Sequence, residues 1–219
     1  MRGNSNPNSI IGRIQRWLSR RLAADKITSE RWVVVDLETS GLDSKADRLL
    51  SIGAVAMFGR AIIIADSFEA TIRQAQASSH ENIVVHGISG SQQRGGQAES
   101  EVLRAFEVWR NGAPLIGWHI GFDLGFLRPA YARNKIEGPT RNSLDLAPFG
   151  QALLKDRSNN LDDYLNRLGI RVQSRHSAAA DAWMTALLAA QLTDIAFKQG
   201  VQDFKSLRTL ANNARWIKT

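Results

Sequence analysis

Five residues, spread from position 36 to position 181, have the types that metal-dependent chemistry requires. They occur in WVVVDLETSGLD, GWHIGFDLGFL and RHSAAADAW, and they are Asp36, Glu38, Asp123, His176 and Asp181. Carboxylate oxygens are the ligands that Mg²⁺ prefers, and an imidazole with a pKa of about 6.5 can accept a proton near neutral pH. Each residue is ordinary alone, but their joint occurrence indicates a site for divalent metal ions with a neighbouring base.

Asp36 and Glu38 follow a run of three valines, which predicts a strand that is buried on both faces. Because strand side chains alternate, both carboxylates lie on one face and Leu37 lies on the other. Two neighbouring carboxylates repel each other, and no Lys or Arg occurs between Trp32 and Asp43 to offset this repulsion. A divalent cation would offset it. The alternative is that both acids lie in solvent at the end of the strand.

The other three residues lie near the starts of two predicted helices. A helix N-terminus favours an anion by roughly 0.3–1 kcal/mol, so Asp123 and Asp181 are also ordinary helix-starting residues. Ser177 is suited to cap the second helix, and His176 directly precedes it. A lone histidine at such a position is usually structural or exposed. Only the combined set favours ligands and a base over these simpler interpretations.

The elements that must position these residues predict an α/β domain. The predicted strands are Arg31–Glu38, Leu49–Phe58, Ala61–Ile72, Pro114–Trp118 and Ser143–Leu146, the second and third joined by a tight hairpin. The predicted helices are Ala98–Arg110, Asp123–Arg133, Ala147–Leu154, Leu161–Leu168, Ser177–Lys198 and Val201–Asn213. The segment that contains His86-Gly87-Ile88 and SGSQQRGGQ is predicted to be a loop. This order implies a mixed sheet flanked by helices.

The net charge of +7 is concentrated at the two ends of the chain. Residues 1–31 contain seven Lys or Arg against two acids, and residues 198–219 contain five against one. Basic ends suit a polyanionic partner such as nucleic acid, and solvated tails are an equally good interpretation. Residues 9–24 are predicted to form a basic amphipathic helix that packs on its own domain or on a partner; nucleic-acid contact and membrane-surface binding are the alternatives.

Length and composition favour one domain at residues 31–198. A basic N-terminal extension at residues 1–30 would precede it, and a basic C-terminal helix at residues 199–219 would pack on it or trail it. No apolar run approaches the roughly 18–20 residues of a membrane span, and the N-terminus lacks the apolar stretch of a secretory signal. The absence of cysteine excludes disulfides and thiolate metal sites. We expect a cytoplasmic location.

The three acidic motifs together resemble those of the DnaQ-like exonuclease family, the DEDD group with a ribonuclease H-like fold, in its histidine-bearing (DEDDh) branch. DLETSGLD at 36–43 resembles the first motif of the family, GFDLGFL at 121–127 the second, and RHSAAADAWMTALL at 175–188 the third. The resemblance covers roughly residues 31–198. It implies a mixed five-stranded sheet flanked by helices, and hydrolysis of single-stranded nucleic acid from the 3′ end.

The resemblance also implies the roles of individual residues. Two Mg²⁺ or Mn²⁺ ions would be held by the four acids Asp36, Glu38, Asp123 and Asp181, with Asp36 shared between the ions. His176 would be the general base and would contact the substrate, and the products would be nucleoside 5′-monophosphates. The backbone near Leu37 and Thr39 would hold the terminal nucleotide. His86 and Phe122 would contact its base or sugar, although Phe122 could equally belong to the core.

The chain departs from the family pattern at Trp118-His119, where relatives commonly carry His-Asn. This change concerns local hydrogen bonding and substrate shape rather than the metals, and His119 is expected to be structural. DNA is the favoured substrate. The alternatives are an exoribonuclease or oligoribonuclease that trims RNA 3′ ends, a proofreading subunit that acts with a polymerase, and an inert binding module. The N-terminal helix would be the surface for a polymerase or another protein.

Overall fold

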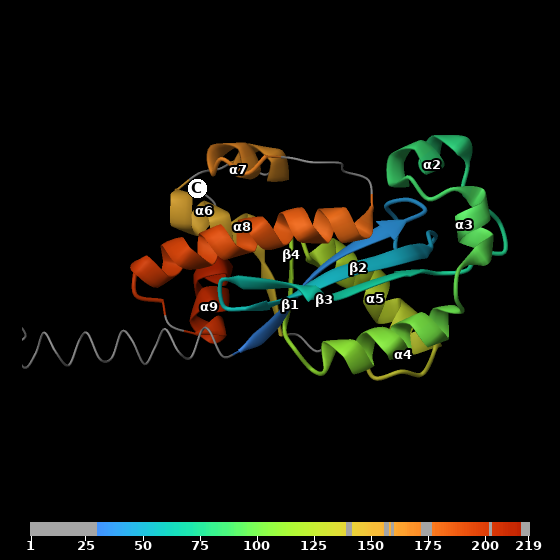
Figure 1. Ribbon diagram of the computed structural model, residues 1–219, viewed down its shortest axis with the longest axis horizontal. Helices are drawn as coiled ribbons and strands as arrows, with labels where there is room; N and C mark the ends of the chain where they lie inside the picture. Colours follow the sequence, from blue (N-terminus) through green and yellow to red (C-terminus); the bar gives the residue numbers. More distant parts are fainter. Residues whose placement is uncertain are drawn as a thin grey trace, which may run out of the picture.

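The computed structural model describes residues 30–138, 142–155, 158, 160–171, 177–201 and 203–215, so His176 and the predicted helix at 9–24 lie outside the description. Within the described residues, five strands form one sheet in the order β3-β2-β1-β4-β5 (Figure 1). They are β1 Arg31–Thr39, β2 Leu49–Phe58, β3 Ala61–Thr71, β4 Leu115–Gly117 and β5 Ser143–Asp145. The first three pair antiparallel, whereas β4 is parallel to β1 and β5 is parallel to β4. The predicted mixed five-stranded sheet is confirmed.

Helices cover both faces of this sheet (Figure 1). The helices of the described residues are α2 His80–His86, α3 Gly90–Gly95, α4 Glu99–Arg110, α5 Gly121–Arg133, α6 Leu146–Leu154, α7 Leu161–Arg167, α8 Ala178–Lys198 and α9 Phe204–Arg215. The long helix α8 lies across β1, β2 and β3 on one face, and α4 and α5 lie on the other face. No helix within the described ranges is both long and apolar enough to cross a membrane.

The central strand β1 alternates its side chains between two hydrophobic cores. Trp32 and Val34 belong to the core that contains residues of α6, α7, α8 and α9. Val33 and Val35 belong to the opposite core, which contains residues of α4 and α5. All four side chains are almost completely buried. The valine run is thus buried on both faces, as predicted, because helices cover both sides of the strand.

The prediction of a loop between β3 and α4 is wrong, because this segment forms the two short helices α2 and α3. Ser79 caps α2 by accepting a hydrogen bond from the Asn82 N–H, and Ser89 and Gln92 form a capping box at the start of α3. Gly87 ends α2 in the left-handed conformation, with φ at 68°. The serines and glycines that suggest a loop here act as helix caps.

The C-terminal helix α9 contributes to the core that it shares with α6 and α8. Phe204, Leu207 and Ala211 are buried, and the ring of Phe204 lies 5.4 Å from that of Trp32, measured between centroids. The helix begins at Phe204 rather than at the predicted Val201. Its apolar side therefore packs on the domain.

Candidate metal centre

Three carboxylates converge where the end of β1 meets the first turn of α8. One oxygen from each of Asp36, Glu38 and Asp181 lies within 4.8 Å of the other two. Asp36 and Glu38 share the face of β1 that carries Trp32 and Val34, which is the face covered by α8. All three acids are half-buried. The group offers closely spaced oxygen ligands of the kind that Mg²⁺ and Mn²⁺ bind.

Asp181 reaches this group because the start of α8 is well defined. The Ser177 side chain accepts a hydrogen bond from the Ala180 N–H at 3.2 Å, which is the N-cap predicted from the sequence. The Ser177 carbonyl accepts a hydrogen bond from the Asp181 N–H at 3.0 Å. The cap fixes the helix start at Ala178 and places Asp181 in the first turn.

The three-carboxylate group is electrostatically unfavourable without a cation. Burial and, after it, the negative charge of Asp181 raise the pKa of Glu38 from 4.5 to about 7. An ionised Glu38 therefore opposes folding at neutral pH unless a positive charge lies nearby. No Lys or Arg occurs between Trp32 and Asp43 to supply it. The set of donor atoms thus fits a divalent ion, which would offset both the burial and the repulsion.

Without divalent ions, the protein is expected to become more stable as the pH falls from 7 towards 4.5. Between these values the folded state binds more protons at Glu38 than the unfolded state does, so the free energy of unfolding decreases as the pH rises. Thermal unfolding in EDTA at a series of pH values measures this dependence. Glu38→Gln should reduce the slope, and the part that remains is expected from Asp123, whose pKa burial also raises. An equally steep dependence in that variant would exclude Glu38 as a cause.

Asp123 approaches β1 from the first turn of α5. Its side chain is buried, and the backbone of Leu37, which lies between Asp36 and Glu38, hydrogen-bonds its carboxylate. Burial is the main cause that raises the pKa of Asp123 well above its usual range, and the charge of Asp145 adds to it. Asp123 is not a member of the three-carboxylate group, although it lies beside the strand that supplies two of its members.

Asp145 is absent from the predicted set, yet it holds the turn that leads into α5. Its Oδ1 accepts hydrogen bonds from the His119 N–H at 3.0 Å and from the Ala147 N–H at 3.2 Å. His119 has a φ of 51°, an unfavourable conformation for a residue other than glycine. An acid between a strand and a helix signals an N-cap, but the contact with His119 depends on the pairing of β4 with β5.

Trp118 and His119, which depart from the family pattern, contribute packing and backbone geometry. The Trp118 ring lies 5.3 Å from the Tyr164 ring of α7 and 5.2 Å from the His119 ring, between centroids. Trp118 thereby extends the core that α8 covers. These contacts are those of structural residues.

Three of the predicted substrate contacts, Leu37, Thr39 and Phe122, differ in how exposed their side chains are. The Leu37 side chain points into the core beside α5, so it is the backbone of this residue that adjoins the carboxylates. Thr39 is half-buried, and its hydroxyl donates to the Gly41 carbonyl at 2.7 Å. Phe122 is 37% exposed and contacts Phe126, with 5.0 Å between ring centroids. Phe122 thus has one packed side and one accessible side.

His86 does not reach the surface in this conformation. It is the last residue of α2 and is only 2% exposed, and its Nδ1 accepts a hydrogen bond from the Ile88 N–H at 3.1 Å. Burial lowers the pKa of His86, so the neutral ring is favoured. The expected contact between His86 and substrate would therefore require α2 to move.

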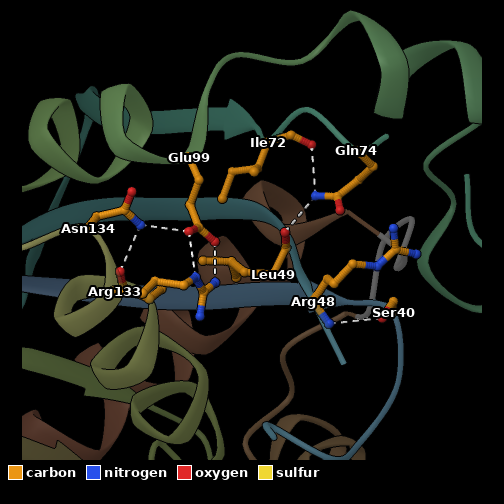
Figure 2. A network of polar contacts seen from close by, with 9 residues as sticks. Ser40, Arg48, Leu49, Ile72, Gln74, Glu99, Arg133 and Asn134 are labelled. Atoms are coloured by element: carbon orange, nitrogen blue, oxygen red, sulfur yellow. Dashed lines mark hydrogen bonds and ion pairs between the residues drawn. The ribbon is translucent and has the colours of Figure 1, made fainter. Parts of the chain in front are cut away.

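Polar contacts attach the segment around α2 to the loop that follows β1. Asn82 Nδ2 donates to the Ser40 carbonyl at 2.8 Å, and the Arg48 guanidinium donates to the Gln76 carbonyl at 2.8 Å. Figure 2 shows the Arg48 N–H donating to the Ser40 hydroxyl, and the Gln74 amide donating to carbonyls at the ends of β2 and β3. Hydrogen bonds therefore hold α2 beside the loop that leaves the metal centre.

Comparison with known proteins identifies the family. Residues 33–189 match the RNase_T family, described as Exonuclease. This range covers more than half of the chain and contains all five residues of the predicted catalytic set. The chain belongs to the RNase T/DEDDh family of exonucleases.

Curated relatives include DNA polymerases III of the PolC type. The chain is 30% identical to the PolC-type polymerase of Oceanobacillus iheyensis over 162 residues, which is 73% of this chain and 11% of the polymerase. It is 28% identical to that of Bacillus subtilis over 180 residues, which is 80% of this chain and 12% of the polymerase. The chain thus corresponds to a small part of these proteins.

Solved structures share the fold. Escherichia coli Exonuclease I in complex with a dT13 oligonucleotide superposes with a TM-score of 0.65 at 18% identity, over 74% of this chain and 41% of that chain. The nuclease domain of 3′hExo, a DEDDh family member, bound to rAMP superposes with a TM-score of 0.66 at 17% identity. The match covers 77% of this chain and 94% of that chain. These superpositions confirm the predicted ribonuclease H-like fold.

Proposed function

We propose that this chain is a metal-dependent 3′–5′ exonuclease that releases nucleoside 5′-monophosphates from single-stranded nucleic acid. The observation that carries this proposal is the convergence of Asp36, Glu38 and Asp181 within 4.8 Å, in a chain of an exonuclease family. The pKa of Glu38, raised by burial and by the charge of Asp181, supports it, because strongly shifted pKa values cluster at functional sites.

Asp36, Glu38, Asp123 and Asp181 would hold two Mg²⁺ or Mn²⁺ ions. When bound, such a pair supplies an activated water and stabilises the leaving oxygen of an in-line displacement at phosphorus. Asp123 would complete the ligand set from the side of α5, where the Leu37 backbone orients its carboxylate. His176, which lies outside the described residues, would accept the proton of the attacking water as a general base.

DNA is the favoured substrate of the proposed enzyme. The PolC-type relatives are named DNA polymerases, and the Exonuclease I structure contains dT13. RNA is the alternative, favoured by the 3′hExo nuclease domain bound to rAMP. The PolC relationship also favours a second role, in which the chain acts with a polymerase through residues 1–30. We place both activities in the cytoplasm.

The proposal is tested by incubating the full chain with 5′-labelled single-stranded DNA and RNA of the same sequence. We expect Mn²⁺ to produce a ladder that shortens one nucleotide at a time from the 3′ end, with mononucleotides as the released product, and we expect EDTA to stop it. Faster shortening of DNA supports the favoured substrate, and faster shortening of RNA supports the alternative. Absence of a metal-dependent product from both strands would contradict the proposal.

A further inference from the structure

Gly53 lies on β2 directly opposite Asp36 in the antiparallel pair of β1 and β2. Directly paired residues of neighbouring strands project to the same face, so a side chain at position 53 would project from the face that carries Asp36 and Glu38. Val55 and Met57, which follow at alternate positions of β2, lie in the core that α8 covers. Gly53 therefore lies beside Asp36, on the face of the sheet that α8 covers.

The first turn of α8 rests on the bare backbone of Gly53. A Cβ atom at this position would lie 2.1 Å from the Ala178 carbonyl carbon, 2.2 Å from the Ala179 nitrogen and 2.4 Å from the Ala178 oxygen. All three are main-chain atoms, so no side chain can rotate away to make room. Ordinary contact begins at 3.4 Å, and the helix would have to retreat by about 1.3 Å to restore it.

We infer that Gly53 is a positioning residue of the metal centre, because it lets α8 approach β2 closely enough to bring Asp181 to Asp36 and Glu38. The inference rests on the proposed function. Asp181 follows Ala178 by one helical turn, and its carboxylate oxygen lies within 4.8 Å of an oxygen from each partner. Mg²⁺–oxygen distances are about 2.0–2.1 Å and tolerate little variation, so a retreat of the helix would separate Asp181 from a shared ion.

Two probe variants crowd the packing at the first turn of α8. Gly53→Ala adds the methyl group from β2, and Ala178→Val enlarges a side chain that is buried at the first turn. Each has a matched control. Gly150→Ala in α6 would place a methyl group 2.7 Å from the Tyr164 ring of α7, and Ala189→Val enlarges a buried alanine of α8 about 16 Å further along the helix.

The test is a titration of thermal unfolding with Mn²⁺, together with kcat/KM on a single strand. We expect both probe variants to need at least about tenfold more Mn²⁺ for half of the thermal shift and to lose about 100-fold in kcat/KM, as a misplacement of roughly 1 Å can cause. Both controls lose thermal stability but keep the wild-type Mn²⁺ midpoint. This contrast distinguishes positioning of a ligand from general packing.

Three outcomes would overturn the inference. A folded Gly53→Ala variant with the wild-type Mn²⁺ midpoint would show that the close approach does not position Asp181. Loss of the fold in both probe variants, with both controls folded, would make the contact a requirement of folding alone. A wild-type protein with neither a Mn²⁺ response nor nuclease activity would overturn the proposed function and this inference together.

Discussion

Replacing Asp181 with asparagine is expected to lower kcat/KM on a single-stranded 3′ end by at least about 1,000-fold, or roughly 4 kcal/mol of transition-state stabilisation. The amide keeps the size of the side chain and removes one of the three converging charges. The proposed site stabilises charge that develops at the scissile phosphate through ions held by these carboxylates, so loss of one ligand affects the chemical step directly. The measurement is the rate of mononucleotide release at low substrate concentration.

Asp194→Asn is the matched control, because the same change is made on the same helix far from the site. Asp194 pairs with Arg60 and Lys198 near the other end of α8. Exposed pairs of this kind contribute about 0–1 kcal/mol to stability, so we expect a slightly lower Tm and an unchanged kcat/KM. Cleavage at the wild-type rate by the Asp181→Asn variant would contradict the assignment of the metal centre.

Addition of Mn²⁺ or Mg²⁺ to the ion-free protein is expected to raise its Tm by roughly 5–10 °C when the ion is present at about 100 times its Kd. Binding to the folded state alone then contributes about 2.7 kcal/mol, and about 1 kcal/mol shifts the Tm of a chain of this size by roughly 2–4 °C. The physical cause is that a bound cation offsets the burial of Glu38 and, after it, the charge of Asp181, which together raise the pKa of Glu38. Thermal unfolding across a metal titration measures the effect, and excess EDTA should reverse it.

Asp181→Asn provides the internal comparison for this stabilisation. The ion-free variant should be more stable than the ion-free wild type, because the charge of Asp181 no longer acts on Glu38. The rise in Tm that Mn²⁺ causes should be much smaller in this variant than in the wild type. A wild-type Tm that does not change at millimolar Mn²⁺ would rule out ion binding at this site.

The strands, and the position of Asp36 and Glu38 on the same face of β1, can be predicted from the sequence because they depend on local periodicity. The valine run indicates a strand covered on both faces, and alternation alone places the two acids together. Ser177 marks the start of α8 through its capping chemistry. The approach of Asp181 to the strand is a tertiary feature, and the family resemblance rather than the spacing of residues anticipates it.

The remaining features depend on contacts between distant parts of the chain. Ser79 and Ser89 suggest a loop until the helices that they cap are known. The burial of His86 follows from the way α2 packs, and the hydrogen bond from His119 to Asp145 requires β4 and β5 to pair. The role of His176 stays a prediction.

The position of β1 at the centre of the sheet bears on which parts of the proposed enzyme would be rigid and which would move. Both of its faces are covered, so we expect the strand that carries Asp36 and Glu38 to belong to the part of the fold that opens last. The α2 segment lies outside the two cores that enclose β1 and is hydrogen-bonded to the loop after this strand, so we expect it to open before β1 does. In the proposed enzyme, the geometry of the metal ligands would depend on β1, and entry of the nucleic-acid strand would depend on the α2 segment. Substitutions in the α2 segment would then change the choice of substrate without moving the carboxylates of β1.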